Sequence, residues 1–197
     1  MLVSTFELLV KRQFPKQEDL PVEVQVPDDL KSKIGRLSRT VIQGYFLTIS
    51  NLNAFDVTLS LVFTIVSNPP ININDLVGFI DVDESNMVAN IQPDLVPNKI
   101  RFTRTIGASD TGLFLLQPNI LKPELLQNEK FEVRGYVEIF ISSLSTGHNS
   151  ARLLLTPEHR GTFYKSLKSK ETPVQLDQIA YSLPTSHGGS LFELSFH

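Results

Sequence analysis

The chain of 197 residues contains no cysteine and no tryptophan. The lack of cysteine excludes disulfides, thiol nucleophiles, iron–sulfur clusters and cysteine zinc sites. No uncharged apolar run approaches the ~18 residues that a membrane span needs. The opening residues also lack the basic stretch and uninterrupted apolar run of a signal peptide. These absences predict a cytoplasmic protein without a membrane span.

Alanine, the strongest helix former, is scarce. The chain has 5 alanines against 16 valines, 14 isoleucines and 13 threonines. Stiff β-branched side chains fit pleated strands and lower helix propensity, so the composition favours an all-β fold. The 41% hydrophobic and 20% charged content is ordinary for a globular protein.

Basic residues are missing from the middle of the chain. Residues 40–98 contain no lysine or arginine but six acidic residues, and the whole chain carries a formal charge of −3. A nucleic-acid groove needs a basic surface, so an acidic middle argues against nucleic acid as a partner.

Alternation of apolar and polar residues is the strongest positive signal. The runs Val57–Ile65 and Phe131–Ile141 place apolar residues at every second position, which predicts half-buried antiparallel strands. Similar runs occur at Leu2–Val10, Val22–Val26, Val41–Ser50, Ile100–Ile106, Leu113–Leu116, Arg152–Leu155 and Leu191–Phe196, with weaker ones at Leu76–Val82 and Met87–Ile91. The chain therefore has roughly ten predicted strands.

Turn residues separate these strands. Asn51–Asn53 predicts a hairpin, Gly107–Gly112 a second connection and Ser143–Ser150 a polar hairpin loop. We therefore expect an antiparallel two-sheet β-sandwich, similar in general architecture to immunoglobulin-type sandwiches but without their Cys…Trp…Cys core. No linker is evident, so residues 1–197 are expected to form a single domain in which segment 1–39 packs on a main sandwich of residues 40–197.

Helical patterns are few and short. Asp28 begins a turn that carries Leu30, Ile34 and Leu37, and a single turn is expected at Pro123–Gln127. A third helix of two or three turns is predicted between Thr172 and Pro184, where proline follows a possible capping residue. We expect none of them to define the fold.

An acidic cluster is the first candidate site, formed by Asp75, Asp81, Asp83 and Glu84. Oxygen ligands at this density suit calcium, which is the one possible cofactor. The alternative is a solvated turn whose carboxylates face the basic residues of the next strand, which are Lys99, Arg101 and Arg104.

The stretch Thr156–Gly161 is the second candidate. Glu158, His159 and Arg160 together offer a base, an acid and an anion anchor. The alternative is a tight turn fixed by Pro157 and Gly161, because consecutive side chains diverge.

We therefore hypothesise a non-catalytic binding or assembly module with a protein partner or self-association. Its contact surface is expected among apolar residues on the polar sides of strands, namely Val62, Val66, Tyr136 and Phe140. Coverage of these residues by segment 1–39 or by the short helices is the alternative. A calcium-dependent module for carbohydrate or lipid head groups is a second hypothesis, and a hydrolase around Glu158, His159 and His187 is a third.

Overall fold

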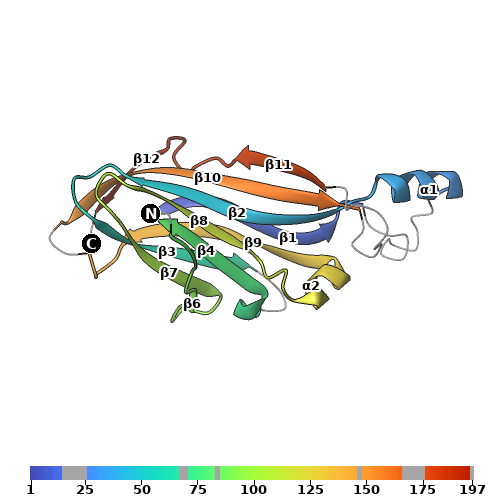
Figure 1. Ribbon diagram of the computed structural model, residues 1–197, viewed down its shortest axis with the longest axis horizontal. Coiled ribbons are helices and arrows are strands. Elements are labelled where there is room, and N and C mark those ends of the chain that lie inside the picture. The colour runs from blue at the N-terminus through green and yellow to red at the C-terminus, as the bar shows by residue number, and fades with distance from the viewer. Residues whose placement is uncertain (15–25, 67–70, 83–84, 146–147, 166–175, 196–197) are drawn as a thin grey trace.

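A computed structural model describes residues 1–14, 26–66, 71–82, 85–145, 148–165 and 176–195, and most of these lie in β-strands (Figure 1). The strands are β1 (Leu2–Arg12), β2 (Thr40–Asn51), β3 (Val57–Val66), β4 (Leu76–Val82), β5 (Ser85–Val88), β6 (Gln92–Pro93), β7 (Lys99–Ile106), β8 (Thr111–Pro118), β9 (Lys130–Ile141), β10 (Ser150–Tyr164), β11 (Leu176–Ser182) and β12 (Leu191–Ser195). The helices are α1 (Asp28–Leu37), a 3₁₀ turn at Ile73–Asp75 and α2 (Pro123–Asn128).

The strands form two antiparallel layers. The first sheet has the order β5-β4-β8-β2-β10, with β11 and β12 both paired to the far edge of β10. The second sheet has the order β1-β9-β3-β7-β6. A short pairing of β1 with β2, from Leu9–Gln43 to Arg12–Thr40, joins the two layers into one curled sheet. The predicted all-β sandwich is confirmed.

The core lies between the layers and is built around aromatic rings. Phe6 packs against Tyr45 and Phe63, with centroids 5.9 and 5.6 Å away. Phe114 of the first sheet contacts Phe63 and Phe102 of the second at 5.4 and 4.9 Å. The alternating residues predicted to face inward do so.

The connections at one end of the molecule run between sheets, and there the predicted hairpins are wrong. The chain crosses from β2 to β3 after Asn51, from β7 to β8 after Ile106 and from β9 to β10 after Ile141, and none of these pairs of strands is hydrogen-bonded (Figure 1). Turn residues mark where a strand ends but do not determine which strand it pairs with.

The side chain of Asn51 joins two of these crossings, from β2 to β3 and from β7 to β8. Its amide nitrogen donates to the carbonyls of Phe55, Ile106 and Gly107 at 2.8, 3.1 and 2.8 Å. Its carbonyl oxygen accepts from the backbone N–H of Asn53 at 3.0 Å. Asn51 is 1% exposed, so every polar group of this side chain is used inside the fold.

One predicted helix is a strand. The C-terminal half of the segment predicted as helical is β11, which pairs with β10 from Tyr164–Leu176 to Glu158–Ser182. Over so short a stretch, an apolar spacing of three or four residues is compatible with either a helix or a strand. Pairing with β10 makes this segment a strand. The helical turns at Asp28–Leu37 and Pro123–Asn128 are confirmed. Of the predicted strand Val22–Val26, residues 22–25 lie outside the described residues and Val26 is not part of a strand.

In the part of the chain that the structure describes, no helix has the length and hydropathy of a membrane span.

Candidate functional site

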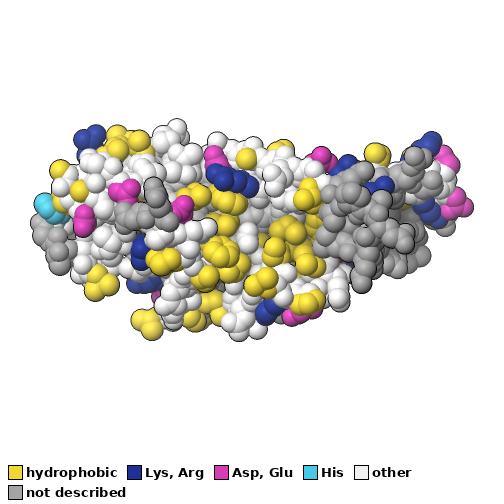
Figure 2. Space-filling view, in the orientation of Figure 1, with side chains coloured by type: hydrophobic (Ala, Val, Ile, Leu, Met, Phe, Trp, Pro, Cys, Tyr) yellow, Lys and Arg dark blue, Asp and Glu magenta, His cyan; other side chains and the backbone are white. Residues whose placement is uncertain are grey.

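The outer face of the first sheet carries a continuous apolar surface. Phe46, Phe79, Val88, Leu113 and Leu115 project from β2, β4, β5 and β8 on the side away from the core, and we call them the outer apolar face. The register puts four of them in one row across the sheet, in the order Val88, Phe79, Leu115, Phe46. Figure 2 shows hydrophobic side chains gathered over the middle of this face.

A groove of about 600 Å³ adjoins this face where β2, β8, β10 and β11 meet. Its floor is at Gly44, where an added Cβ would lie 3.2 Å from both the Gln117 side chain and the Leu116 carbonyl. The absence of a side chain there keeps the groove open. The groove is lined by Ile42, Gly44, Phe46, Gln117, Ile120, Arg160, Gly161, Thr162, Gln178, Ile179 and Ala180.

Arg160 is the charged residue of this lining. Its guanidinium lies 4.4 Å from the centre of the Phe46 ring, which is a cation–π contact. It also donates to the carboxylate of Glu158 from Nε and Nη2, both at 3.0 Å. The groove therefore offers apolar side chains and glycine beside one positively charged group that is held in place by two neighbours.

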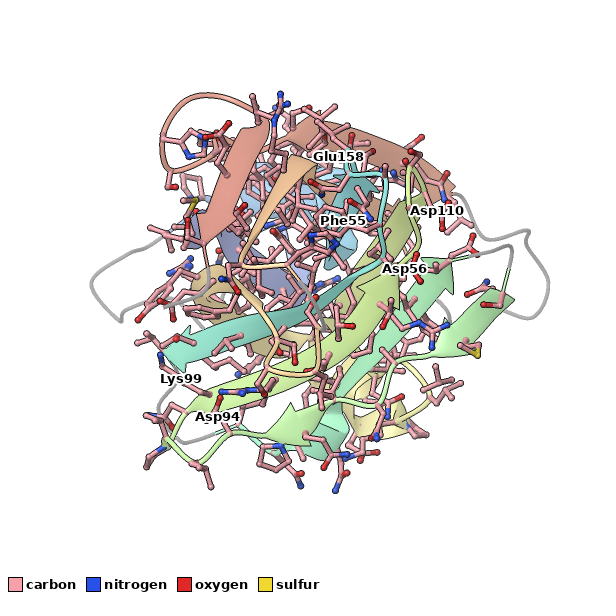
Figure 3. All side chains as sticks on the ribbon, turned by 90° about the vertical axis from the view of Figure 1, so that its left-hand side faces the viewer. Phe55, Asp56, Asp94, Lys99, Asp110 and Glu158 are labelled. Carbon is pink, nitrogen blue, oxygen red and sulfur yellow. The ribbon has the colours of Figure 1, made fainter. Side chains whose placement is uncertain are left out.

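The outer face of the second sheet is charged. Lys99 pairs with Glu138 at 3.1 Å across β7, β3 and β9, and Arg101 pairs with Asp94 at 2.9 Å. Further ion pairs join Arg134 to Glu7 at 2.7 Å, and Lys11 and Arg134 to Glu132. Figure 3 shows the labelled Asp94 and Lys99 on the opposite side of the molecule from Glu158. This face is an ion-pair ladder along the strands.

The predicted apolar contact surface lies on this charged face and is wrong for one residue. Val62 is only 3% exposed, and its cross-strand neighbours are Arg101 and Glu138, two long side chains of the same face. Val66 and Phe140 are exposed as expected, at 71% and 43%.

The expected tight turn at Thr156–Gly161 is the middle of the 15-residue strand β10. Proline is tolerated at position 157 because it lies in the gap between the residues of β10 that pair with β12 and those that pair with β11. Its carbonyl accepts from the Leu183 N–H at 2.8 Å. In a strand, neighbouring side chains point to opposite faces, so Glu158 and Arg160 face outward and His159 faces inward.

His159 is held by hydrogen bonds on both ring nitrogens. The backbone N–H of Glu7 donates to Nε2 at 2.9 Å, and Nδ1 lies 3.0 Å from the Tyr181 hydroxyl. Burial lowers the pKa of His159, and the nearby Glu7 carboxylate only partly opposes this effect. A neutral ring with both nitrogens engaged has no free lone pair for a substrate proton.

The hydrolase trio is therefore not brought together. His187 is exposed, its Nε2 donates to the Leu191 carbonyl at 3.0 Å, and its ring packs on Phe192. Glu158 and His159 face opposite sides of the sheet.

The acidic cluster is also not assembled as predicted. Asp75 and Asp81 lie at opposite ends of β4, about 20 Å apart at the rise of an extended chain, so one calcium ion cannot bridge them. Asp75 pairs with Lys122 at 2.6 Å. Asp83 and Glu84 lie outside the described residues. Within the described ranges, no group of three or more acidic, histidine or cysteine side chains could hold a metal ion.

The expected basic partners of that cluster are elsewhere. Lys99, Arg101 and Arg104 belong to β7, which lies in the second sheet, whereas β4 lies in the first. For Asp75 and Asp81 that pairing prediction is wrong, because β7 pairs with β3 and β6.

Sequence reasoning missed the groove. Its residues come from four strands and a loop, and the order of strands in the first sheet brings them together. The available signal was the apolar pair Ile42 and Phe46 at positions that alternate with the inward-facing residues of β2.

Comparison with protein-family models gives no match, and neither does comparison with curated protein sequences. Among the solved structures compared, two examples show a weak likeness to this chain. One is ACE19, the collagen-binding subdomain of the Enterococcus faecalis surface protein ACE, with 12% identity over 74% of this chain and 85% of that chain and a TM-score of 0.21. The other is AvmM, which catalyses macrocyclization in alchivemycin A biosynthesis, with 9% identity over 74% and 78% and a TM-score of 0.15.

Proposed function

We propose that this protein is a non-catalytic binding module that contacts a partner protein through the outer apolar face and the adjoining groove. The observation that carries the proposal is the open apolar row Val88, Phe79, Leu115 and Phe46, which runs up to a groove in the same sheet. Apolar surface of this kind on one face of a sheet is a typical contact surface, whereas singly exposed apolar residues are not.

The groove indicates the chemistry of the contact. Its volume of about 600 Å³ is large enough for several apolar side chains. Arg160 is positioned to bind a carboxylate at the rim, because its guanidinium is fixed between Phe46 and Glu158. The partner segment is therefore expected to carry apolar side chains beside an anionic group.

Two matched dyes test this chemistry without a known partner. Anilinonaphthalene sulfonate and the uncharged N-phenyl-naphthylamine share one apolar ring system and differ in the anionic group. We expect the anionic dye to bind more tightly, as measured by fluorescence titration. Phe46→Ser should weaken the binding of both dyes by about tenfold, because it removes apolar contact area.

Variants of the rim separate charge from apolar contact. Arg160→Gln should weaken only the anionic dye, and Glu158→Gln should tighten it by releasing Arg160 from its partner. Phe140→Ser, which removes an exposed aromatic ring from the other sheet, is the matched control and should change neither titration. Equal effects of the serine variants at positions 46 and 140 would contradict the proposal.

Self-association is tested with the same variant. Light scattering of the wild-type protein gives the mass of the particle in solution. A dimer that Phe46→Ser converts to monomer would identify a second copy of this chain as the partner. If the wild type and Phe46→Ser are both monomers, the partner is a different protein.

A further inference from the structure

Three side chains and the backbone of Glu7 close a ring of hydrogen bonds at the place where the two sheets separate. The backbone N–H of Glu7 donates to His159 Nε2 at 2.9 Å, so the single proton of the neutral ring is on Nδ1. Nδ1–H then donates to the Tyr181 hydroxyl at 3.0 Å, and that hydroxyl donates to Gln43 Oε1 at 3.3 Å. Gln43 Nε2 returns to the Glu7 carbonyl at 3.2 Å.

The ring exists because the pairing of β1 with β2 ends at Leu9. Beyond that residue the edge of β1 turns away from β2, and the polar backbone groups of Glu7 need other partners. His159 of β10 accepts from the N–H and Gln43 of β2 donates to the carbonyl. Tyr181 brings β11 into the same ring, so one histidine connects four strands.

Strand β11 is an exposed edge strand of the first sheet. All seven of its residues are exposed, and in the described part of the chain it pairs only with β10. Two side chains fasten it to the rest of the molecule, Tyr181 through the ring and Asp177 through an ion pair with Arg39. Its residues Gln178, Ile179 and Ala180 form one wall of the groove.

We infer that His159 is an acid-sensitive latch, whose protonation releases β11 and thereby dismantles one wall of the groove. An imidazolium carries a proton on both nitrogens, so Nε2–H would point at the N–H of Glu7. Two donors cannot share that position, and the buried N–H of Glu7 would lose its acceptor. The imidazolium keeps its bond to Tyr181 but needs water around its charge. Among the described residues that contact the ring, Tyr181 of the edge strand β11 is the exposed one, at 43%, so movement of β11 is the opening that hydrates His159.

The groups around the imidazole oppose a charge at this position. His159 is 6% exposed, and its ring makes edge-to-face contacts with the uncharged aromatic rings of Tyr45 and Tyr181. The one nearby anion, the Glu7 carboxylate, is itself bonded by Arg134 at 2.7 Å and approached by the Gln43 amide. Burial therefore outweighs Glu7, and the pKa of His159 is lowered.

The direction of the pH effect follows from this lowered pKa. An opened β11 exposes His159, which then has the ordinary pKa of about 6.5. Below that pH the opened form takes up a proton that the closed form refuses, so opening becomes about tenfold more frequent per pH unit until the lowered pKa is reached. Above about pH 6.5 the latch is closed.

Hydrogen exchange of the full chain measures the release directly. Between pH 7.5 and 5.5, after correction for intrinsic exchange rates, we expect amides of residues 176–182 to lose about tenfold in protection while those of β2 and β8 are unchanged. His159→Gln keeps one acceptor and one donor but cannot titrate, so its β11 should be insensitive to pH. His187→Gln is the matched control and should behave as wild type.

Each other result overturns the inference. Uniform loss of protection over all strands, or an equal loss in His159→Gln, would show that His159 does not control β11. If His159→Gln does not fold, as judged by circular dichroism, the wild-type protein is titrated by NMR. The His159 ring nitrogens and the β11 amides must then change over one pH range, and separate ranges refute the latch.

The second half of the inference rests on the proposed function and is tested separately. Anilinonaphthalene sulfonate should bind less tightly at pH 5.5 than at 7.5 in the wild type, and equally at both values in His159→Gln. Equal wild-type binding at both values refutes control of the groove. A dye that binds at neither pH refutes the proposed function, while hydrogen exchange still decides on the latch.

Discussion

The two sheets both have apolar inner faces, but their outer faces differ: that of the first sheet is apolar and that of the second is charged. The second sheet carries ion pairs such as Lys99–Glu138 and Arg134–Glu7 on its outer face, and the apolar Val62 of that face is buried. The first sheet leaves Phe46, Phe79 and Leu115 half-buried on its outer face. A solvated ladder needs no partner, whereas an apolar row beside a groove gains free energy when something covers it.

The largest loss of stability is expected from truncating a side chain in the core that the two sheets share. Leu61→Ala should lower the free energy of unfolding by about 2–5 kcal/mol, because Leu61 is 2% exposed and packs between the layers. Phe46→Ala should cost clearly less, since its ring is half-buried on an outer face. Urea denaturation measures both. A Phe46 variant as destabilised as the Leu61 variant would make the outer apolar face part of the core.

A smaller effect is expected from the ion-pair ladder. The side chains of Lys99 and Glu138 keep about a quarter of their surface exposed, and such pairs contribute roughly 0–1 kcal/mol. A double-mutant cycle with Lys99→Gln and Glu138→Gln should give a coupling of this size that weakens with added salt. A coupling that persists in high salt would contradict a solvated ladder.

The smallest effect is expected from calcium. Because Asp75 and Asp81 are about 20 Å apart and Asp75 already pairs with Lys122, millimolar calcium should leave the melting temperature unchanged. Bound calcium at a hundred times its Kd would instead add about 2.7 kcal/mol to the stability. Calorimetry of the wild type and of Asp81→Asn distinguishes these results.

The sequence predicted the strands well because alternation is a local property. Prediction from sequence failed where the structure depends on which strands pair with each other. Asn51 marks a strand end but does not reveal that β2 and β3 belong to different sheets. The apolar spacing in β11 is compatible with a helix, and only its pairing with β10 makes this segment a strand. Pro157 is typical of a turn, and only the gap between two edge strands explains its place within β10.

The candidate site was harder to predict because it depends on which strands are neighbours. His159 was identified as a candidate, but alternation along β10 separates it from Glu158 and Arg160, and its partners Glu7 and Tyr181 come from distant segments. The groove needs β2, β8, β10 and β11 in one order, which no local pattern contains.

The Asn51 side chain has a consequence for the chemical ageing of the protein. Spontaneous hydrolysis of its amide would replace a nitrogen that donates to three carbonyls with a carboxylate oxygen facing the same carbonyls. Deamidation at the protein surface usually has little effect on stability. At the buried Asn51, where both amide hydrogens are bonded, it would strongly destabilise the fold. Molecules in which Asn51 is deamidated would unfold, so the molecules that stay folded over time would be those with an intact Asn51.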